Sequence, residues 1–291
     1  MLRTTTRLAL SALVSCVAVA ASAQETGDSE TTPAAYEGSV FDGDWVSVGA
    51  GAVFSPSYDG SDDYVVSPIP IVQGSLGGVG INPRPGGFAL DFIPDENGQV
   101  AFTGGVALRI NRNRADQIKD RVVKQYGELD TAIEIGPALG VKLPALINPF
   151  DSLSFNLDVL WDVAGAHKGM TVNPSVTYFT PLSRGVAVSL SLSAGHVDDD
   201  YADYYYSVPA LTTLAPEDTL PEFNAGGGFD SAGVNLLVAA DLDGDVTNGG
   251  FAIIFLGGYS KVLGDAKRTP FTSIRGTDDQ WMGALGIGYT F

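Results

Sequence analysis

The residues best suited to catalysis stand close together late in the sequence, where His196 precedes three consecutive acids, Asp198 to Asp200. A histidine held by a carboxylate can act as a general base, so an Asp/His hydrolase is one interpretation of this segment. Catalysis also needs a nucleophile fixed in geometry with that base, and no second element supplies one. We therefore favour a solvated histidine beside an acidic loop and expect no enzymatic activity. The other histidine, His167, lies in a tight loop beside Lys168 and supports no site.

Acidic groups elsewhere could bind cations. The run Asp241-Leu-Asp-Gly-Asp245 resembles the start of an EF-hand loop, which needs Gly at its sixth position and Glu at its twelfth. Val246 and Ala252 occupy those positions, so a turn is favoured. Two further clusters could hold divalent cations only loosely: Asp59, Asp62 and Asp63, and Asp198 to Asp200. We expect neither a cofactor nor a fixed metal site.

A third group of charges lies within segments where apolar residues alternate with small or polar ones. These are Arg109, Glu134, Lys142, Asp158 and Asp162. If the apolar side of each segment faces outward, the five charges face an enclosed lumen. Charges of both signs there pair and brace the interior, or they line a path for water. We favour bracing, because three consecutive segments bring the charges close together.

The last eleven residues show what these segments are. Trp281, Gly283, Leu285, Ile287, Tyr289 and Phe291 form one face, and the alternate residues are small. A period of two over this length is typical of a transmembrane strand, which needs roughly 9–11 residues. Outer-membrane barrels usually end on such an aromatic residue. We therefore interpret Phe291, Tyr289 and Ile287 as the closing-strand assembly signal.

The same alternation recurs along the chain and predicts about twelve strands. The weakest is 64–73, because Pro68 and Pro70 share one face and proline removes a ladder hydrogen bond. Short connections alternate with long ones, as in bacterial barrels with short periplasmic turns, and an even strand number returns both termini to the periplasm. The alternate residues of each strand, which form its second face, are mainly Gly, Ser, Thr and Asn, and such a face suits a lumen. We predict an all-β, transmembrane antiparallel β-barrel of the cell outer membrane, with Val188 facing lipid and Ser189 facing the lumen.

The N-terminus predicts export. Two arginines, a short apolar run and the sequence Ala21-Ser-Ala23 indicate a signal peptide, 1–23, cleaved after Ala23. A lipoprotein box at Leu13 to Cys16 is the alternative. We assign 24–44 to a disordered acidic lead-in and 45–291 to the barrel. Cleavage would remove the only cysteine and change the net charge from −18 to −20, so we expect no disulfide and no nucleic acid partner.

Several segments go beyond the general features of barrels. They are Tyr58-Asp-Gly-Ser-Asp-Asp-Tyr64, Pro68-Ile-Pro70, Pro85-Gly-Gly87, Tyr205-Tyr-Ser-Val208, Gly258-Tyr259 and Leu263-Gly-Asp-Ala266. In this order they resemble the MipA/OmpV family, over essentially all of the predicted mature chain. The basic run Ala266-Lys-Arg-Thr-Pro270 departs from the acidic or small segment expected in that loop. The resemblance implies an outer-membrane protein, and one family member is a scaffold between a murein lytic transglycosylase and a murein synthase.

Three hypotheses for function follow. The first, implied by the resemblance, is a scaffolding barrel embedded in outer-membrane lipid that meets those murein enzymes on its periplasmic side. The second is a passive channel for small solutes, and the third is a hydrolase at the barrel rim around His196. No motif in the sequence corresponds to a murein enzyme contact, so the first rests on the family level alone.

Overall fold

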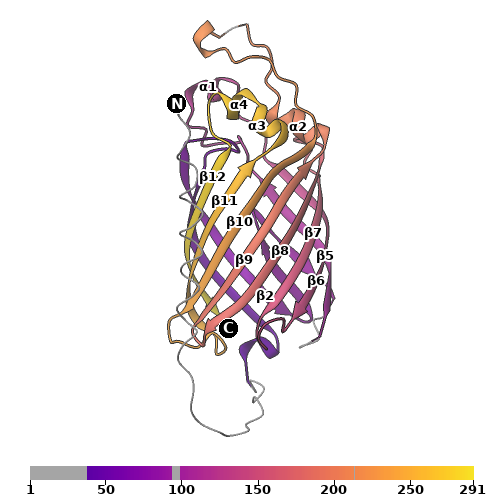
Figure 1. The fold of residues 1–291 in the computed structure, drawn as a ribbon, viewed down its shortest axis with the longest axis vertical. Coiled ribbons are helices and arrows are strands. Elements are labelled where there is room, and N and C mark those ends of the chain that lie inside the picture. The colour runs from indigo at the N-terminus through magenta and orange to yellow at the C-terminus, as the bar shows by residue number, and fades with distance from the viewer. Residues whose placement is uncertain (1–37, 94–98, 213) are drawn as a thin grey trace, which may run out of the picture. The chain divides into compact units, whose positions relative to one another are not determined.

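The computed structural model describes residues 38–93, 99–212 and 214–291. Twelve strands, each antiparallel to its neighbours, form one closed barrel in which β12 pairs with β1 (Figure 1). The predicted all-β antiparallel barrel and its strand number are confirmed. The strands are β1 (Trp45–Pro56), β2 (Tyr64–Leu76), β3 (Val79–Arg84), β4 (Gly87–Asp91), β5 (Ala101–Asn111), β6 (Ala132–Pro144), β7 (Ser152–Asp162), β8 (Met170–Ser183), β9 (Val186–Val197), β10 (Gly228–Asp241), β11 (Gly250–Val262) and β12 (Asp279–Thr290).

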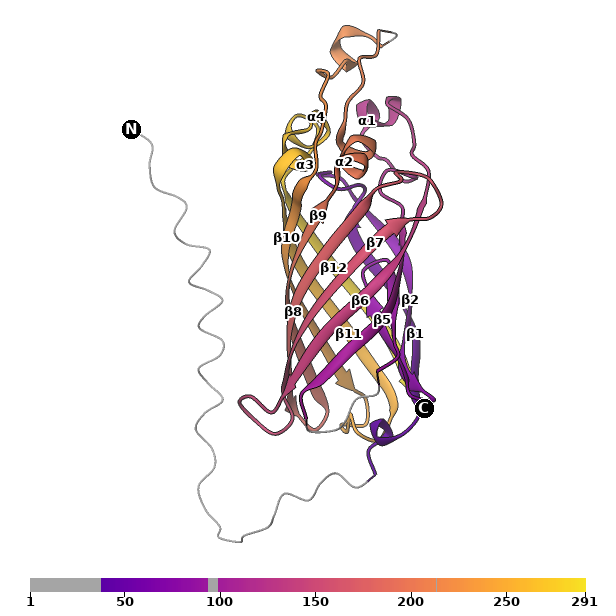
Figure 2. The same cartoon turned by 90° about the vertical axis from the view of Figure 1, so that its right-hand side faces the viewer.

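The helices gather at one end of the barrel. They are α1 (Arg121–Gln125), α2 (Asp199–Tyr206), α3 (Gly264–Arg268) and α4 (Pro270–Ser273). Figures 1 and 2 show them on the long loops, which we call the helix end, whereas Phe291 and the short turns lie at the opposite end, the turn end. No helix in the described ranges is long and apolar enough to cross a membrane.

Two short 3-10 helices complete the elements, η1 (Val40–Asp42) and η2 (Pro216–Asp218). The predicted lead-in, 24–44, is described only from Gly38, and η1 gives its last residues a regular structure. The predicted signal peptide, 1–23, lies outside the described residues.

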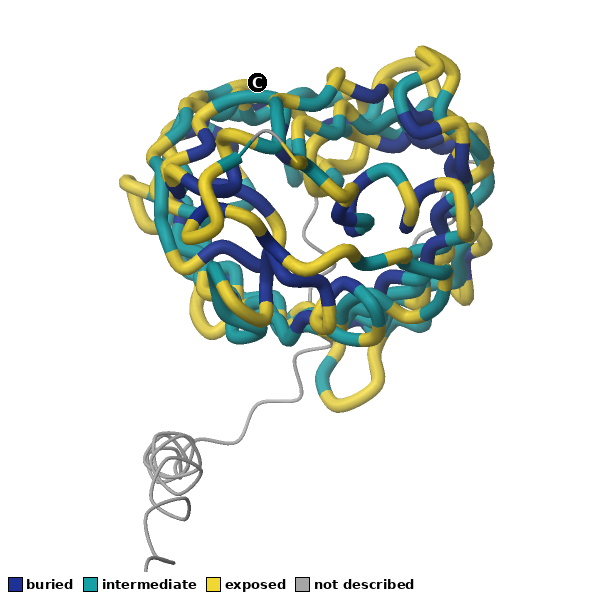
Figure 3. The backbone as a smooth tube through the Cα atoms, turned by 90° about the horizontal axis from the view of Figure 1, so that it is seen from above, coloured by how far each residue is buried: buried dark blue, intermediate teal, exposed yellow. Residues whose placement is uncertain are grey.

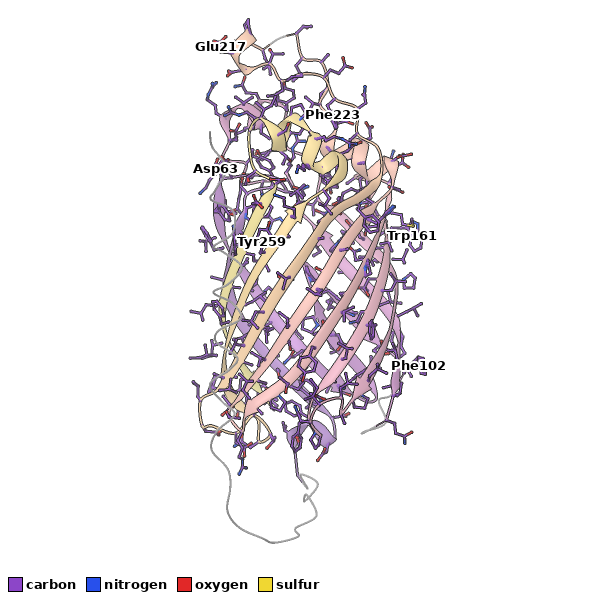
Figure 4. The ribbon with its side chains drawn as sticks, in the orientation of Figure 1. Asp63, Phe102, Trp161, Glu217, Phe223 and Tyr259 are labelled. Atoms are coloured by element: carbon purple, nitrogen blue, oxygen red, sulfur yellow. The ribbon has the colours of Figure 1, made fainter. Side chains whose placement is uncertain are left out.

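The outer face of the wall is apolar, as the alternation predicted. On β12, Trp281, Leu285 and Ile287 are exposed, whereas Ala284 between them is buried toward the interior. Phe102 and Trp161 likewise project outward from the wall (Figure 4). A closed wall with an apolar exterior satisfies its backbone hydrogen bonds internally, which is what a strand needs in order to cross a bilayer.

Two groups of aromatic rings frame this apolar surface on β11 and β12. Phe251, Tyr289 and Phe291 are in contact at the turn end, and Tyr259 contacts Trp281 toward the helix end. Phe251 and Tyr259 are eight residues apart. At ~3.3 Å per residue and a tilt of ~40°, this spacing corresponds to ~20 Å along the axis, near the ~25 Å height of an outer-membrane barrel's apolar band. The wall is therefore that of a transmembrane barrel of the outer-membrane type.

The inward-facing residues are small where β1 meets β12. Gly49 lies opposite Gly288, and a Cβ at Gly49 would lie 2.2 Å from the carbonyl oxygen of Ile287. Glycine is therefore required at position 49 for β1 to lie this close to β12. Seen along the barrel, the strands form a ring, and segments of backbone cross its interior (Figure 3).

The proline-containing strand β2 has a partner along only part of one edge. It pairs with β1 over its whole length, but with β3 only from Gly74 to Leu76. We call the unpaired stretch beside residues 64–73 the β2–β3 gap. It is bounded by β2, by the turn between β3 and β4, and by the end of β5.

The register explains how β2 accommodates its prolines. The amide of Phe291 donates to the carbonyl of Val46, so the backbone of Val46 faces β12. Gly74 lies opposite Val46, and its own amide therefore points away from β1. Pro68 and Pro70 share the parity of Gly74, so their nitrogens point into the gap, where no ladder hydrogen bond is lost.

Candidate functional site

Four long loops pack together at the helix end of the barrel and form a cap. Its first core joins the loops 57–63, 112–131, 198–227 and 263–278. The buried members are Tyr58, Ile118, Val122, Val123, Val208, Leu220 and Phe271, and Tyr126 and Phe223 pack against them. Figure 4 shows Phe223 among these loops. Residues distant in sequence thus form one hydrophobic core above the lumen.

A second core lies beside the first and anchors α2 to the wall. It contains Val197, Tyr201, Ala202, Tyr205, Tyr206, Val262 and Ala266. Asp198 caps α2 by accepting from the amide of Tyr201, and it also accepts from the amide of Met170 on β8. The acids that suggested a rim hydrolase therefore include one with a structural role in the cap.

Two charged side chains, Arg114 and Asp120, fasten the cap. Arg114 is almost fully buried, with its guanidinium carbon 4.0 Å from the centre of the Phe271 ring, and it donates to the carbonyl of Tyr205. Burial lowers the pKa of Arg114 to about 10, although Tyr58 and Tyr204 oppose the shift. Asp120 accepts from two amides of α1 and from Arg275 at 2.6 Å, and so joins two loops.

Removing the Asp120 carboxylate is expected to loosen the cap. Burial disfavours its ionised form, but Arg275 and the α1 amides outweigh that effect and hold the pKa of Asp120 below its ordinary value. The ionised group therefore stabilises the cap fully above the ordinary pKa of ~3.9, and this contribution is lost as the pH falls from there through the folded value. Asp120→Ala should cost about 1–2 kcal/mol at pH 7 and progressively less as the pH falls below ~3.9. Amide hydrogen exchange in α1 and α4, corrected for intrinsic rates, measures this difference.

Asp116→Ala is the matched control, because Asp116 pairs with Arg112 on the exposed surface of the same loop. An exposed pair of this kind contributes only about 0–1 kcal/mol. Equal acceleration of exchange in the two variants would contradict a fastening role for Asp120.

Below the cap, Glu134 on β6 is the centre of a buried polar network. It is fully buried and accepts from Arg109 Nε on β5 at 2.6 Å and from Asn111. Arg109 donates further to Thr171 at 2.9 Å and to Asn173, both on β8. The pair therefore spans from β5 and β6 to β8 across the lumen. Arg109 and Glu134 carry opposite charges, and both are engaged in hydrogen bonds. A buried ion pair is tolerated only under this condition.

His167 completes this network, although no sequence pattern predicted that position for it. Its Nδ1 accepts from the amide of Gly169, so its proton is on Nε2, which lies 3.3 Å from Glu134 Oε1. The ring also packs edge-on against Tyr201 of α2. The tight loop that holds His167 folds inward and links the network to the cap.

A cavity of about 360 Å³ lies between the network and the cap. Its lining includes Asp59 of the loop 57–63, Arg109, Tyr201 and Asp230, and also the β3–β4 turn beside the β2–β3 gap. Burial raises the pKa of Asp59 to about 6, Asp230 adds to the shift and Arg109 opposes it. The side chain of Asp59 nevertheless stays exposed to the cavity. This cavity is of a size that accepts small molecules.

The five charges expected in the lumen do not form one cluster. Arg109 and Glu134 pair, but Asp158 pairs with Arg84 of β3 at 2.8 Å, a partner that the sequence analysis did not identify. Asp162 accepts from the amides of Ala164, Gly165 and Lys168 and so shapes the β7–β8 loop. Lys142 lies on the same parity toward the turn end, opposite Ala101 and Ser154.

The remaining candidates, His196 and Asp241, make contacts within their own turn or with the neighbouring strand. His196 lies on the outward parity of β9, with its ring edge-on to Phe229, and in the described ranges it has no hydrogen bond to an acid. Asp241 accepts from the amides of Asp243, Gly244 and Asp245, which makes the segment a turn. Within the part of the chain that the structure describes, no three His, Cys, Asp or Glu side chains are placed to hold a metal.

Three of the segments that carry the family resemblance, 58–64, 205–208 and 263–266, contribute residues to the cap. Tyr58 lies in its first core, and Gly60, at φ +91°, approaches Thr272 so closely that a Cβ would meet the threonine hydroxyl at 2.1 Å. Tyr205 and Tyr206 lie in the second core, and Asp265 accepts from the amide of Gly226.

Comparison with known proteins identifies the family of this chain. A family model described as "MltA-interacting protein MipA" matches residues 48–291. A search of curated proteins finds no match. Similar solved structures include an outer membrane channel from Pseudomonas putida F1, at 13% identity over 92% of this chain and 100% of that one, with a TM-score of 0.44. They also include OmpT of Vibrio cholerae, at 8% identity over 85% and 97% of the two chains, with a TM-score of 0.35. No function follows from such distant likenesses, but the family match covers almost the whole described barrel, and the chain therefore belongs to the MipA family.

Proposed function

We propose that this protein is a closed, structural barrel of the outer membrane that binds a murein lytic transglycosylase, and through it murein synthesis, at its turn end. In this proposal both termini lie in the periplasm, where murein is found, and the helix end faces outward. The family description as an MltA-interacting protein supports the choice of partner. The packed cap supports a structural role over a passive channel for small solutes, because its two cores hold the long loops together at the end through which solutes would enter.

The observation that carries the proposal is a set of apolar side chains displayed at the turn end. Ile147 is 81% exposed and Leu242 58%, each in a short turn, and Leu182, next to the last residue of β8, is 68% exposed. Large apolar residues gathered at one end of a protein mark an interaction surface. Burying each against a partner would contribute about 1.5–3 kcal/mol.

The turn carrying Ile147 is held rigid. The carboxylate of Asp151 accepts from the amides of Leu146 and Ile147 and from the Tyr178 hydroxyl of the neighbouring strand β8. With its amide bonded to Asp151, Ile147 keeps its side chain exposed. A partner therefore meets an ordered surface and loses little conformational freedom on binding.

Neighbouring turns are joined into one rim. Asn148 donates to Thr180, Arg184 pairs with Asp245 at 2.5 Å, and the amide of Val40 in η1 donates to the carbonyl of Thr247. These contacts connect the β6–β7, β8–β9 and β10–β11 turns with η1. The exposed residues Ile147, Leu182 and Leu242 thus belong to a continuous structure.

Ile147→Asp is expected to weaken binding of a purified MltA-type transglycosylase about tenfold or more, because it places a charge where an apolar contact forms. Biolayer interferometry with the barrel in nanodiscs measures the dissociation constant. Ile274→Asp is the matched control, since Ile274 is 55% exposed but lies at the helix end. Binding that is equally weakened by both changes, or by neither, would reject the turn end as the docking surface.

The two other functions make different predictions. A passive channel would give conductance steps in a planar bilayer, and a rim hydrolase would lose activity in His196→Ala. We assign the protein no catalytic step, because His196 faces outward against Phe229 while Asp198 caps α2.

A further inference from the structure

The cavity below the cap has an unbalanced charge. Four charged side chains reach its lining: Asp59, Arg109, Arg112 and Asp230. The two basic ones already have carboxylate partners elsewhere, because Arg109 pairs with Glu134 and Arg112 with Asp116. The two acidic ones have no cationic partner among the described residues.

Arg109 has little capacity left for an anion. Its Nε donates to Glu134, one terminal nitrogen donates to Asn173 and the other to Thr171. Glu134 is fully buried and neutralises its charge. An anionic ligand in the cavity would therefore meet two carboxylates and a guanidinium that is already paired.

Asp59 and Asp230 have acceptor capacity left over. Asp230 accepts from the hydroxyls of Tyr206 and Ser231, both neutral groups. The amide of Asp59 donates to Asn113, which fixes its backbone, but no described residue donates to its carboxylate. Each carboxylate offers about four lone-pair sites, so both can accept from a ligand.

We infer that this cavity binds a small organic cation carrying ammonium groups, held between Asp59 and Asp230 with Tyr201 and Asn173 beside it. An ammonium group donates three hydrogen bonds and accepts none, which matches a lining rich in free acceptors. The site is distinct from the proposed docking surface, because it lies at the opposite end of the barrel.

A metal ion fits this site less well than an ammonium group. Calcium takes six to eight oxygen ligands, and no three acidic or histidine side chains in the described ranges are placed around one point. An organic cation needs only separate acceptors along its length, as Asp59 and Asp230 provide from opposite elements.

The cavity lies beside the part of the wall where β2 lacks a strand partner. Pro85 and Gly86 of the β3–β4 turn and Ile110 of β5 belong to its lining. These residues also frame the β2–β3 gap, where β2 has no strand beside residues 64–73.

Isothermal titration calorimetry on the complete barrel in detergent micelles tests the inference with three probes of equal chain length. They are 1,5-diaminopentane, 1,5-pentanediol and glutarate. The diamine should bind at least tenfold more tightly than the diol, and glutarate should not bind. Asp59→Asn and Asp230→Asn should each weaken diamine binding at least tenfold. Asp62→Asn is the control, because Asp62 lies in the same loop but outside the cavity lining.

The pH dependence gives a second readout that needs no variant. Asp59 faces Asp230, Arg109 and the hydroxyls of Tyr201, Tyr205 and Tyr206. Burial and Asp59 among other groups raise the pKa of Tyr201, so the tyrosines stay neutral. The diamine keeps both charges from pH 5 to 8 (amine pKa ~10), whereas Asp59 gains a proton below about 6. Affinity should therefore fall from pH 7.5 to 5 in the wild type and fall less in Asp59→Asn.

Three results would overturn the inference. They are the absence of diamine binding at millimolar concentration, equal binding of all three probes, and a loss in Asp62→Asn as large as in Asp59→Asn. Stronger binding of Mg²⁺ than of the diamine would likewise exclude an organic cation as the ligand. Heat-modifiable migration on gels confirms that each variant forms a folded barrel.

Discussion

Replacement of Glu134 by alanine is expected to destabilise the barrel by about 3–5 kcal/mol, the usual cost of removing one member of a buried ion pair. Glu134 is fully buried and accepts from Arg109, Asn111 and His167. Its removal leaves the Arg109 guanidinium inside the lumen with only neutral partners, Thr171 and Asn173. Guanidinium unfolding in detergent, followed by intrinsic fluorescence, measures the free energy of unfolding.

A double-mutant cycle separates the ion pair from the loss of packing. Arg109→Ala combined with Glu134→Ala should cost less than the sum of the single changes, because neither charge is then left without its partner. Glu128→Ala, in an exposed loop, is the control and should change stability by less than ~0.5 kcal/mol. Additive single effects would mean that Glu134 acts through packing and not through Arg109.

The second large effect is expected on the lipid-facing surface. Leu192 lies near the middle of β9 on the outward parity and is 57% exposed. Leu192→Arg should cost about 2–4 kcal/mol, the depth-dependent cost of an arginine near the bilayer midplane. Ser193→Arg, one residue further on, should cost much less because its side chain faces the lumen. Urea unfolding of the barrel in lipid vesicles measures both.

The structure also changes which residue is the right probe of the outer face. Val188 faces outward as the sequence predicts, but it lies two residues from the turn-end start of β9. Arginine near an interface costs only about 0–1 kcal/mol, so Val188→Arg should be mild. Equal costs for Leu192→Arg and Ser193→Arg would show that the two faces of β9 are wrongly assigned.

The barrel could be predicted because lipid imposes a strict rule on every residue of a strand. Alternation such as Ile133, Ile135 and Leu139 against Glu134 places each side chain on one face without knowledge of its neighbours. Even the weak strand β2 was predicted near its true bounds, Tyr64–Leu76. Its prolines were hard to interpret from the sequence alone, because only the register shows that their nitrogens point into the β2–β3 gap.

The interior contacts could not be predicted in the same way. Parity places Asp158 in the lumen but does not reveal Arg84 as its partner, since β3 and β7 are not neighbours. His167 gave no signal, because its role depends on a loop that folds inward onto Glu134. The cap was missed as a unit, although its signal was present: the motif residues Tyr58, Tyr205 and Val208 are apolar or aromatic residues in loops that a simple pore would keep polar.

The incomplete pairing of β2 has a mechanical consequence. A barrel made from one chain would be expected to separate first where its first and last strands meet. Here that junction is well paired, from Ser47 with Thr290 to Phe54 with Gly283. The pairing of β2 with β3 is limited to the short stretch from Gly74 with Ile81 to Leu76 with Val79. The weakest joint of the wall is thus internal to the chain, so the cylinder can yield sideways at one hinge while its two ends remain fastened.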